Sequence, residues 1–228
     1  IADAPSVRIY VQQADVWLYL PDWPPPTEEQ SLYLAAGRAL LDRPNSERDS
    51  SSRFRYDPSD PTPSVAGPVL FPPAGQAENA ALESRSDVLV FTGPALTQSI
   101  DVVGTPRAEI VCTAETPYAD LFVRVCDVDP KGRSRNVVDG MLRLDNRIGE
   151  TATSIELPLY PTAYRFRAGH RIRVLVAGGA FPRFARNLGT GQEWSTGMEM
   201  QPNTVRVLHD VTHVSRVILP VLKRDADG

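Results

Sequence analysis

The sequence predicts an all-β protein, an antiparallel β-sandwich of the jelly-roll type with a long proline-rich connection on its surface. Short stretches alternate apolar and polar residues with a period of two, which indicates strands with one buried face. The 21 prolines and 15 glycines interrupt these stretches, as turns between strands require. At 228 residues the chain has the size of one large sandwich, so we expect a single domain over residues 1–228, with its core at about 5–222.

Five alternating stretches predict strands. In chain order they lie at residues 7–11, 108–112, 121–125, 172–176 and 217–221. In the third stretch Arg124 alternates with apolar residues, so we expect it on the face away from the core. The turn Asp129-Pro130-Lys131-Gly132 has proline second and glycine fourth, as in a type I turn, and predicts a hairpin of 119–129 with 134–144. The Ala/Leu-rich run 32–41 is the best helix signal, and it fits a strand followed by a turn equally well.

Residues 43–80 differ in composition from the rest of the chain. Six prolines follow a run of three serines in this segment. Because each proline fixes φ and removes a donor, regular strand pairing cannot extend far here. Phe54, Tyr56 and the run 69–71 punctuate the segment and favour burial. We therefore predict an extended connection that crosses the sandwich surface, in preference to a linker between two domains.

The stretch 179–192, GAFPRFARNLGTGQ, follows the strand-like run 171–177 and is the most informative part of the chain. Glycine and proline fix the path of such a loop. In one interpretation it is a long connection between strands, and Phe181 and Phe184 fill the end of the sandwich. In the other it is an interaction surface, because aromatic side chains and the planar donors of Arg183 and Arg186 are typical anchors of interfaces.

Charge and composition exclude several classes of protein. The net charge of −4 carries no clustered basic face, so we expect no nucleic-acid partner. The basic run 165–173 alternates with apolar residues and is predicted to be a solvated outer face. No apolar stretch approaches 18 residues, so we expect no membrane span. Cys112 and Cys126 lie in strand-like runs, and two cysteines do not indicate a disulfide scaffold. The sequence leaves the compartment unknown and favours the cytoplasm.

No catalytic serine is recognisable. An α/β-hydrolase nucleophile needs a Gly-x-Ser-x-Gly turn. Ser195 has Glu193 in place of the first glycine, and Ser134 is followed by Asn136 in place of the second. We therefore predict that the chain alone is not an enzyme.

Metal ligands and cofactors are not predicted either. His209 and His213 have the spacing of a helical zinc site, but they lie between two strand-like runs. Residues four apart on an extended chain are about 13 Å apart, too far for one ion, so we expect surface or domain-contact histidines. The acidic pairs Asp57/Asp60 and Asp127/Asp129 fit turn starters better than a calcium loop.

Seven segments, in the same order along the chain, resemble the C-terminal domain of the cocaine esterase and X-Pro dipeptidyl-peptidase (CocE/NonD) hydrolase family. Together with the loop 179–192 they cover about residues 5–222. They are PSVRIYVQQADVW (5–17), Asp22-Trp23-Pro24, YDPSDPTPSVAG (56–67), DVVGTPRAEIV (101–111), DVDPKGR (127–133), FRAGHRIRVLVAG (166–178) and HDVTHVSRVILPV (209–221). Val214 departs from the pattern, because the family usually has proline after the second histidine of this turn.

The resemblance implies a galactose-binding-domain-like jelly roll without catalytic residues of its own. In this family the serine, aspartate and histidine lie in a preceding α/β-hydrolase domain, and the parent is an esterase, amidase or X-Pro dipeptidyl-peptidase. The chain begins Ile1-Ala2-Asp3 without methionine, so we expect more chain before it. Its partner would be that catalytic domain, with a homo-oligomer possible.

We expect the jelly roll to pack on the catalytic domain and to help shape the approach to its active site. The candidate interface residues are Trp23, Phe181, Pro182, Arg183, Phe184, Arg186, Asn187, His209 and His213. The alternative is a free-standing carbohydrate-binding module. Such a module needs an exposed aromatic platform, for which Trp17, Trp23 and Trp194 are the available tryptophans.

Overall fold

The computed structural model describes residues 5–70, 72 and 74–223. The polar tail 224–228, Phe71 and Pro73 lie outside the described residues. The strands are β1 (Val7–Val11), β2 (Val16–Leu20), β3 (Thr27–Ala35), β4 (Ala39–Leu41), β5 (Ser51–Tyr56), β6 (Val88–Ala95), β7 (Ile100–Gly104), β8 (Arg107–Ala114), β9 (Asp120–Val128), β10 (Ser134–Arg143), β11 (Thr153–Pro158), β12 (Thr162–Phe166), β13 (Arg171–Ala177), β14 (Asn203–Leu208) and β15 (Arg216–Leu222). Two helical turns, η1 (Ala36–Arg38) and α1 (Ala80–Glu83), complete the described elements. The all-β prediction is confirmed.

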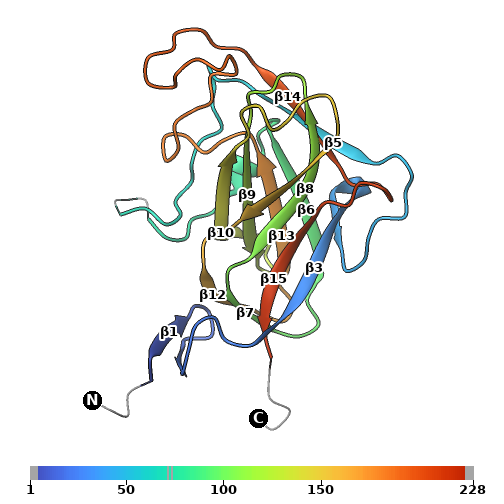
Figure 1. Ribbon diagram of the computed structural model, residues 1–228. Helices are drawn as coiled ribbons and strands as arrows, with labels where there is room; N and C mark the ends of the chain where they lie inside the picture. The colour runs from blue at the N-terminus through green and yellow to red at the C-terminus, as the bar shows by residue number, and fades with distance from the viewer. Residues whose placement is uncertain (1–4, 71, 73, 224–228) are drawn as a thin grey trace.

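The large sheet folds over itself into a sandwich (Figure 1). One layer runs β10-β9-β13-β6-β4, and the other runs β3-β15-β8-β14-β5. Strands β3 and β4 are antiparallel neighbours joined by η1, so the turn at 36–38 carries the chain from one layer to the other. Gly37 takes φ 66° there, a value that glycine adopts without strain. Strands β1 and β2 form a separate two-stranded sheet at the end where both termini lie (Figure 1).

The main core lies between the two layers. Large fully buried side chains from both layers meet there, among them Phe54, Phe91, Ile110 and Tyr164. Strand β9 is buried on both faces, because Leu121, Val123 and Val125 face this core while Phe122 and Cys126 join a second apolar cluster. That second cluster contains Leu82 of α1 and Ala180 beyond β13. The outer face of β9 is therefore covered by α1 and by residues that follow β13.

The predicted hairpin is confirmed. Strands β9 and β10 pair antiparallel, with Ser134 opposite Val128. The amide of Gly132 donates to the carbonyl oxygen of Asp129 at 2.9 Å, which closes the predicted turn. The run 32–41 forms a strand, a short turn and a second strand, so the helix interpretation of that run is wrong. Leu32 and Leu34 of β3 and Leu40 of β4 all face the main core from two paired strands.

The proline-rich segment holds one regular strand and then crosses the outer face of β9. Strand β5 pairs with β14 before the prolines begin, and it buries Phe54 and Tyr56 as predicted. After it the prolines prevent long pairing. The expected burial of Leu70 is wrong, because this side chain is fully exposed.

Cys112 and Cys126 are both free and buried. Among the described residues, no helix is long and apolar enough to cross a membrane.

Candidate functional site

The loop 179–192 is fastened to the proline-rich segment through its backbone. The amide of Phe181 donates to the carbonyl oxygen of Thr62 at 2.8 Å, and the amide of Ser64 donates to that of Phe181 at 2.7 Å. The Phe181–Pro182 peptide bond is cis. The Phe181 side chain keeps 40% of its surface exposed, whereas Phe184 packs against the second apolar cluster. Phe184 therefore contributes to the apolar interior of the domain, whereas Phe181 remains partly on its surface.

A buried ion cluster lies under this loop. Arg124 is 0% exposed and donates to Asp139 from Nε and Nη2, at 3.1 and 2.8 Å. The Nη1 of Arg183, 7% exposed, donates to the other oxygen of Asp139 at 2.7 Å. Arg124 also donates at 2.8 Å to Asn79 and to the carbonyl oxygen of Val65. Arg124 lies on the face of β9 away from the main core, as expected, but it is buried there because the proline-rich segment and the loop cover that face.

A second buried carboxylate holds the far half of the loop. Asp120 receives hydrogen bonds from Arg143 at 2.9 and 3.0 Å and from the Asn187 amide at 3.0 Å. Asn187 also donates to Asp145 at 2.9 Å, and Arg143 donates to the carbonyl oxygen of Ala185 at 2.8 Å. Burial raises the pKa of Asp120, and the hydrogen bonds from Arg143 and Asn187 oppose that rise. Charged and amide groups of the loop are thus bound within the domain.

Three of the predicted interface residues have partners within the domain. Arg183 and Asn187 donate to internal carboxylates, and Arg186 donates to the carbonyl oxygen of Pro58 at 3.2 Å. Phe181 and Pro182 remain exposed. The interpretation of the loop as a structural connection therefore holds for its polar side chains.

Trp23 lies in the wall of a hollow of about 460 Å³. It is half-buried and packs against the small cluster of Val11, Val103 and Ala163, which leaves no flat exposed face for a sugar. The hollow opens between β1, the segment 67–76 and β10. Asp139 and Tyr160 line the same hollow, and the guanidinium of Arg183 lies 5.3 Å from the Tyr160 ring. Trp23 thus lies in the wall of this hollow, and Arg183 of the loop 179–192 contacts two other residues of the same wall, Asp139 and Tyr160.

His209 is an internal group. It is 2% exposed and lies between two serines, with Ser50 Oγ 2.9 Å from Nδ1 and Ser52 Oγ 3.0 Å from Nε2. Burial lowers its pKa. A Ser-His-Asp triad needs a carboxylate on one ring nitrogen, and here serines occupy both. The expected surface position of His209 is wrong, because it bridges the first residues of β5 to the end of β14.

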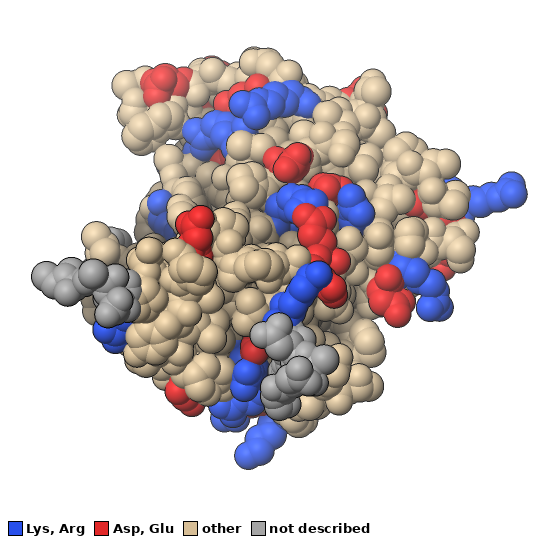
Figure 2. All heavy atoms as spheres, turned by 60° about the horizontal axis from the view of Figure 1, so that its bottom comes forward, with Lys and Arg blue, Asp and Glu red and all other residues tan. Residues whose placement is uncertain are grey.

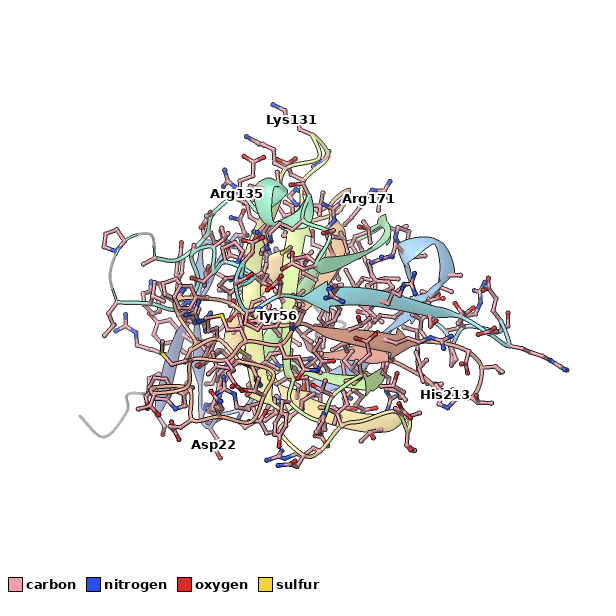
Figure 3. All side chains as sticks on the ribbon, turned by 90° about the horizontal axis from the view of Figure 1, so that it is seen from above. Asp22, Tyr56, Lys131, Arg135, Arg171 and His213 are labelled. Atoms are coloured by element: carbon pink, nitrogen blue, oxygen red, sulfur yellow. The ribbon has the colours of Figure 1, made fainter. Side chains whose placement is uncertain are left out.

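The other two histidines each face one aspartate. His213 is partly exposed and lies 3.0 Å from Asp210, while His170 lies 2.9 Å from Asp127 on another part of the domain. Figure 3 shows His213 on the opposite side of the view from Asp22, which neighbours Trp23. No group of three or more potential metal ligands occurs among residues 5–70, 72 and 74–223. His213 therefore lies away from Trp23, and these candidate residues do not gather at one place.

The sequence analysis missed an exposed aromatic face on the β1–β2 hairpin. Arg8 lies opposite Tyr19 and Tyr10 opposite Trp17, so all four side chains share one face. Trp17 and Tyr19 are 51% and 58% exposed. Figure 2 turns this end of the molecule forward and shows a broad area of uncharged side chains with charged ones at its borders. In VRIYV and VWLYL, large side chains occur at both odd and even positions, so both faces of the hairpin carry large side chains. This pattern is the signal that could have identified the exposed face.

Comparison with known proteins gives consistent matches over the whole fold. The family described as the X-Pro dipeptidyl-peptidase C-terminal non-catalytic domain matches residues 1–218. The chain is 30% identical over 248 residues to a cocaine esterase of Rhodococcus sp., covering 98% of this chain and 43% of the esterase. An α-amino acid ester hydrolase superposes with a TM-score of 0.86 at 24% identity, over 96% of this chain and 41% of that one. An aminopeptidase from a marine sediment Thaumarchaeota archaeon superposes at 0.85 with 22% identity, over 97% and 41%. The chain thus spans less than half the length of these relatives.

Proposed function

The chain belongs to the family of non-catalytic C-terminal domains of X-Pro dipeptidyl-peptidases, and on that premise we propose that its parent is a serine hydrolase of the CocE/NonD type. The parent would cleave esters, amides or X-Pro peptides with a serine in a preceding α/β-hydrolase domain. The similarity to a cocaine esterase over 98% of this chain, but only 43% of that enzyme, supports this organisation. Residues 1–228 would then form one domain of a longer protein.

The proposed role of this domain is to pack on the catalytic domain and to help shape the approach to its active site. The observation that carries this role is the hollow of about 460 Å³ that Trp23 and Tyr160 line. Tyr160 is 46% exposed, and Phe181 nearby in the fold is 40% exposed. Apolar surface of this kind is stabilised when a neighbouring domain covers it. Trp23, Phe181 and Pro182 remain the proposed interface residues, with Phe184 supporting the loop from inside, and His213 is an exposed candidate at a distance.

We assign the catalytic chemistry of the parent to that preceding domain, because no histidine among residues 5–70, 72 and 74–223 joins a serine to a carboxylate. The two serines beside His209 lack the carboxylate that would orient the ring. The Asp127–His170 pair has Tyr164 as its further partner, at 2.9 Å from Asp127, and not a serine. These clusters are accounted for as buried hydrogen-bonding groups of the domain.

The test is to assay the parent and the chain 1–228 side by side with a p-nitrophenyl ester and a Gly-Pro anilide. We expect turnover by the parent alone, and a serine-directed phosphonate should label a serine that precedes Ile1. Turnover by the chain itself, with the label on one of its own serines, would refute the proposal. The chain with Ser50→Ala and Ser52→Ala controls for adventitious labelling beside His209.

A further inference from the structure

We propose that the outer face of the β1–β2 hairpin, made by Arg8, Tyr10, Trp17 and Tyr19, is the surface on which the preceding catalytic domain of the parent chain docks. We call these four residues the hairpin face. The inference rests on the proposed function, since it assigns the contact surface of the domain pair described above. It adds a surface that is separate from the loop 179–192 and formed by the first strands of the chain.

One face of the hairpin packs against the rest of the domain, whereas the other, bare face is exposed to solvent. Its inner side chains Ile9, Val11 and Leu18 pack with Val103 and Ala163 of the body. Its outer side chains are exposed, and β1 and β2 pair with each other outside the large sheet. Trp17 and Tyr19 leave more than half of their surface exposed. An isolated two-stranded sheet is marginally stable by itself, so covering the bare face would stabilise it.

The hairpin face has the composition of an interface centre. Tryptophan, tyrosine and arginine are the residues that most often anchor protein interfaces. The guanidinium of Arg8 lies 4.9 Å from the Trp17 ring and 5.5 Å from the Tyr19 ring. The Tyr10 hydroxyl donates to Asp15 at 2.8 Å, and its ring lies 5.4 Å from that of Trp17. The side chains are held in place before any partner arrives, which lowers the entropy lost on docking.

The position of the hairpin selects the catalytic domain as the occupant. The family is C-terminal, and the relatives carry more than half of their length outside the matching region. Strand β1 starts at Val7, and six residues span at most about 20 Å when fully extended. A domain that joins the chain at residue 1 must therefore begin close to the hairpin face. Loop 190–200, with exposed Trp194, lies beyond β13 at the other end of the domain (Figure 1).

A sugar ligand is the competing occupant, and the ring geometry disfavours it. The planes of Tyr10 and Trp17 are inclined at 59°, so the two rings do not form a flat platform. Arg8 lies over the rings of both Trp17 and Tyr19 and occupies faces on which a sugar would stack. A protein surface with carboxylate or carbonyl groups for Arg8 and apolar area for the rings fits this arrangement better.

Hydroxyl-radical footprinting of the parent and of the chain 1–228 tests the inference. Trp17 and Tyr19 should be labelled in the chain alone and lose that labelling in the parent. Trp194, a tryptophan of similar exposure (58%) on the far loop, should be labelled in both and serves as the matched control. Protection elsewhere on the chain, with Trp17 and Tyr19 still labelled, would overturn this docking surface and leave the proposed function standing. Protection nowhere on the chain would contradict the packing of the two domains itself.

Substitution gives a second readout. In the parent, Trp17→Ala with Tyr19→Ala should lower the thermal midpoint and raise labelling of the remaining hairpin residues, whereas Trp194→Ala should change neither. Losing aromatic anchors of this type weakens docking by roughly tenfold or more. Equal effects of both substitutions would overturn the assignment. Protection of Trp17 in the isolated chain by added malto- or cello-oligosaccharide, without protection in the parent, would assign the face to a sugar and overturn it as well.

Discussion

The loop 179–192 and the hairpin face both combine aromatic rings with arginines, yet the structure uses them in opposite ways. In the loop, Arg183 is 7% exposed and bound to Asp139, while on the hairpin Arg8 lies over two exposed rings. The loop side chains meet buried carboxylates on β9 and β10, and the hairpin side chains meet none. The same residue types thus stabilise the domain in one region and remain available to a partner in the other.

The difference arises from what lies under each segment. The outer face of β9 carries Asp120 and Arg124, which need partners once the chain covers them. The loop supplies those partners through Arg183 and Asn187. Under the hairpin lie Val103 and Ala163, which form an apolar cluster with Val11 of β1 and need only apolar contacts. Arginine and aromatic content alone therefore does not distinguish a segment bound within the domain from one that leaves these side chains exposed.

The largest expected effect comes from removing the shared carboxylate of the loop. Asp139→Ala leaves Arg124 and Arg183 facing each other without a counter-charge, and breaking a buried pair in this way costs about 3–5 kcal/mol. Urea denaturation of the chain 1–228 measures the loss. Asp42→Ala, which removes an ion pair with Arg43 in which both side chains are largely exposed, is the matched control and should cost less than about 1 kcal/mol. Equal losses would show that the Asp139 cluster is not special.

The second substitution tests the other anchor of the loop. Asn187→Ala removes the amide that donates to Asp120 and Asp145, at 3.0 and 2.9 Å. Leaving buried acceptors short of a partner costs about 1–3 kcal/mol. The same denaturation experiment should show this smaller loss, and limited proteolysis should cut the loop sooner. A variant as stable as the parent chain would mean that the far half of the loop is not held by Asn187.

A pH experiment distinguishes buried polar groups from exposed ones. Burial lowers the pKa of His209, so the folded value lies below the unfolded value of about 6.5. Stability from this group is present above about pH 6.5 and is lost as the pH falls towards the folded pKa, because the unfolded chain binds the proton first. His209→Gln should therefore flatten the stability profile between about pH 7 and pH 5. A profile with the same slope in the variant would contradict burial of a neutral imidazole.

The smallest effect is expected on the hairpin face of the isolated chain. Trp17→Ala removes a ring that is 51% exposed and lies beside Arg8 and Tyr10 of the hairpin face. Surface substitutions of this kind usually change the free energy of unfolding by no more than about 0.5 kcal/mol. Chemical denaturation of the chain measures it. A loss of several kcal/mol would show that Trp17 stabilises the domain itself, and the contrast between the hairpin face and the loop 179–192 would then be wrong.

Strand periodicity predicted most of the fold, because each strand keeps one apolar face towards the core. The β9–β10 hairpin followed from one turn and two flanking alternations. What covers the outer face of a strand depends on distant parts of the chain. The alternation placed Arg124 on that face but did not reveal that Val65, Asn79 and Arg183 surround it there. A local pattern carries no signal for that coverage.

The candidate site was predicted less well for the same reason. Trp23 and Phe181 were identified from residue type and from the resemblance, and both are at least partly exposed. Arg183 and Asn187 have the same chemistry as interface donors, and only their partners Asp139 and Asp120, more than 40 positions away, decide their role. The hairpin face was missed because exposure of a strand face is decided by whether a second sheet covers it.

The most direct test compares Arg183→Ala with Trp17→Ala in the chain 1–228 by urea denaturation. We expect Arg183→Ala to lower the free energy of unfolding by about 1–3 kcal/mol, since Asp139 loses one of its two buried partners. We expect a change within about 0.5 kcal/mol for Trp17→Ala. If Arg183→Ala leaves the free energy of unfolding unchanged while Trp17→Ala lowers it by several kcal/mol, the loop is the free surface and the hairpin is the structural element, which would contradict the roles assigned to them here.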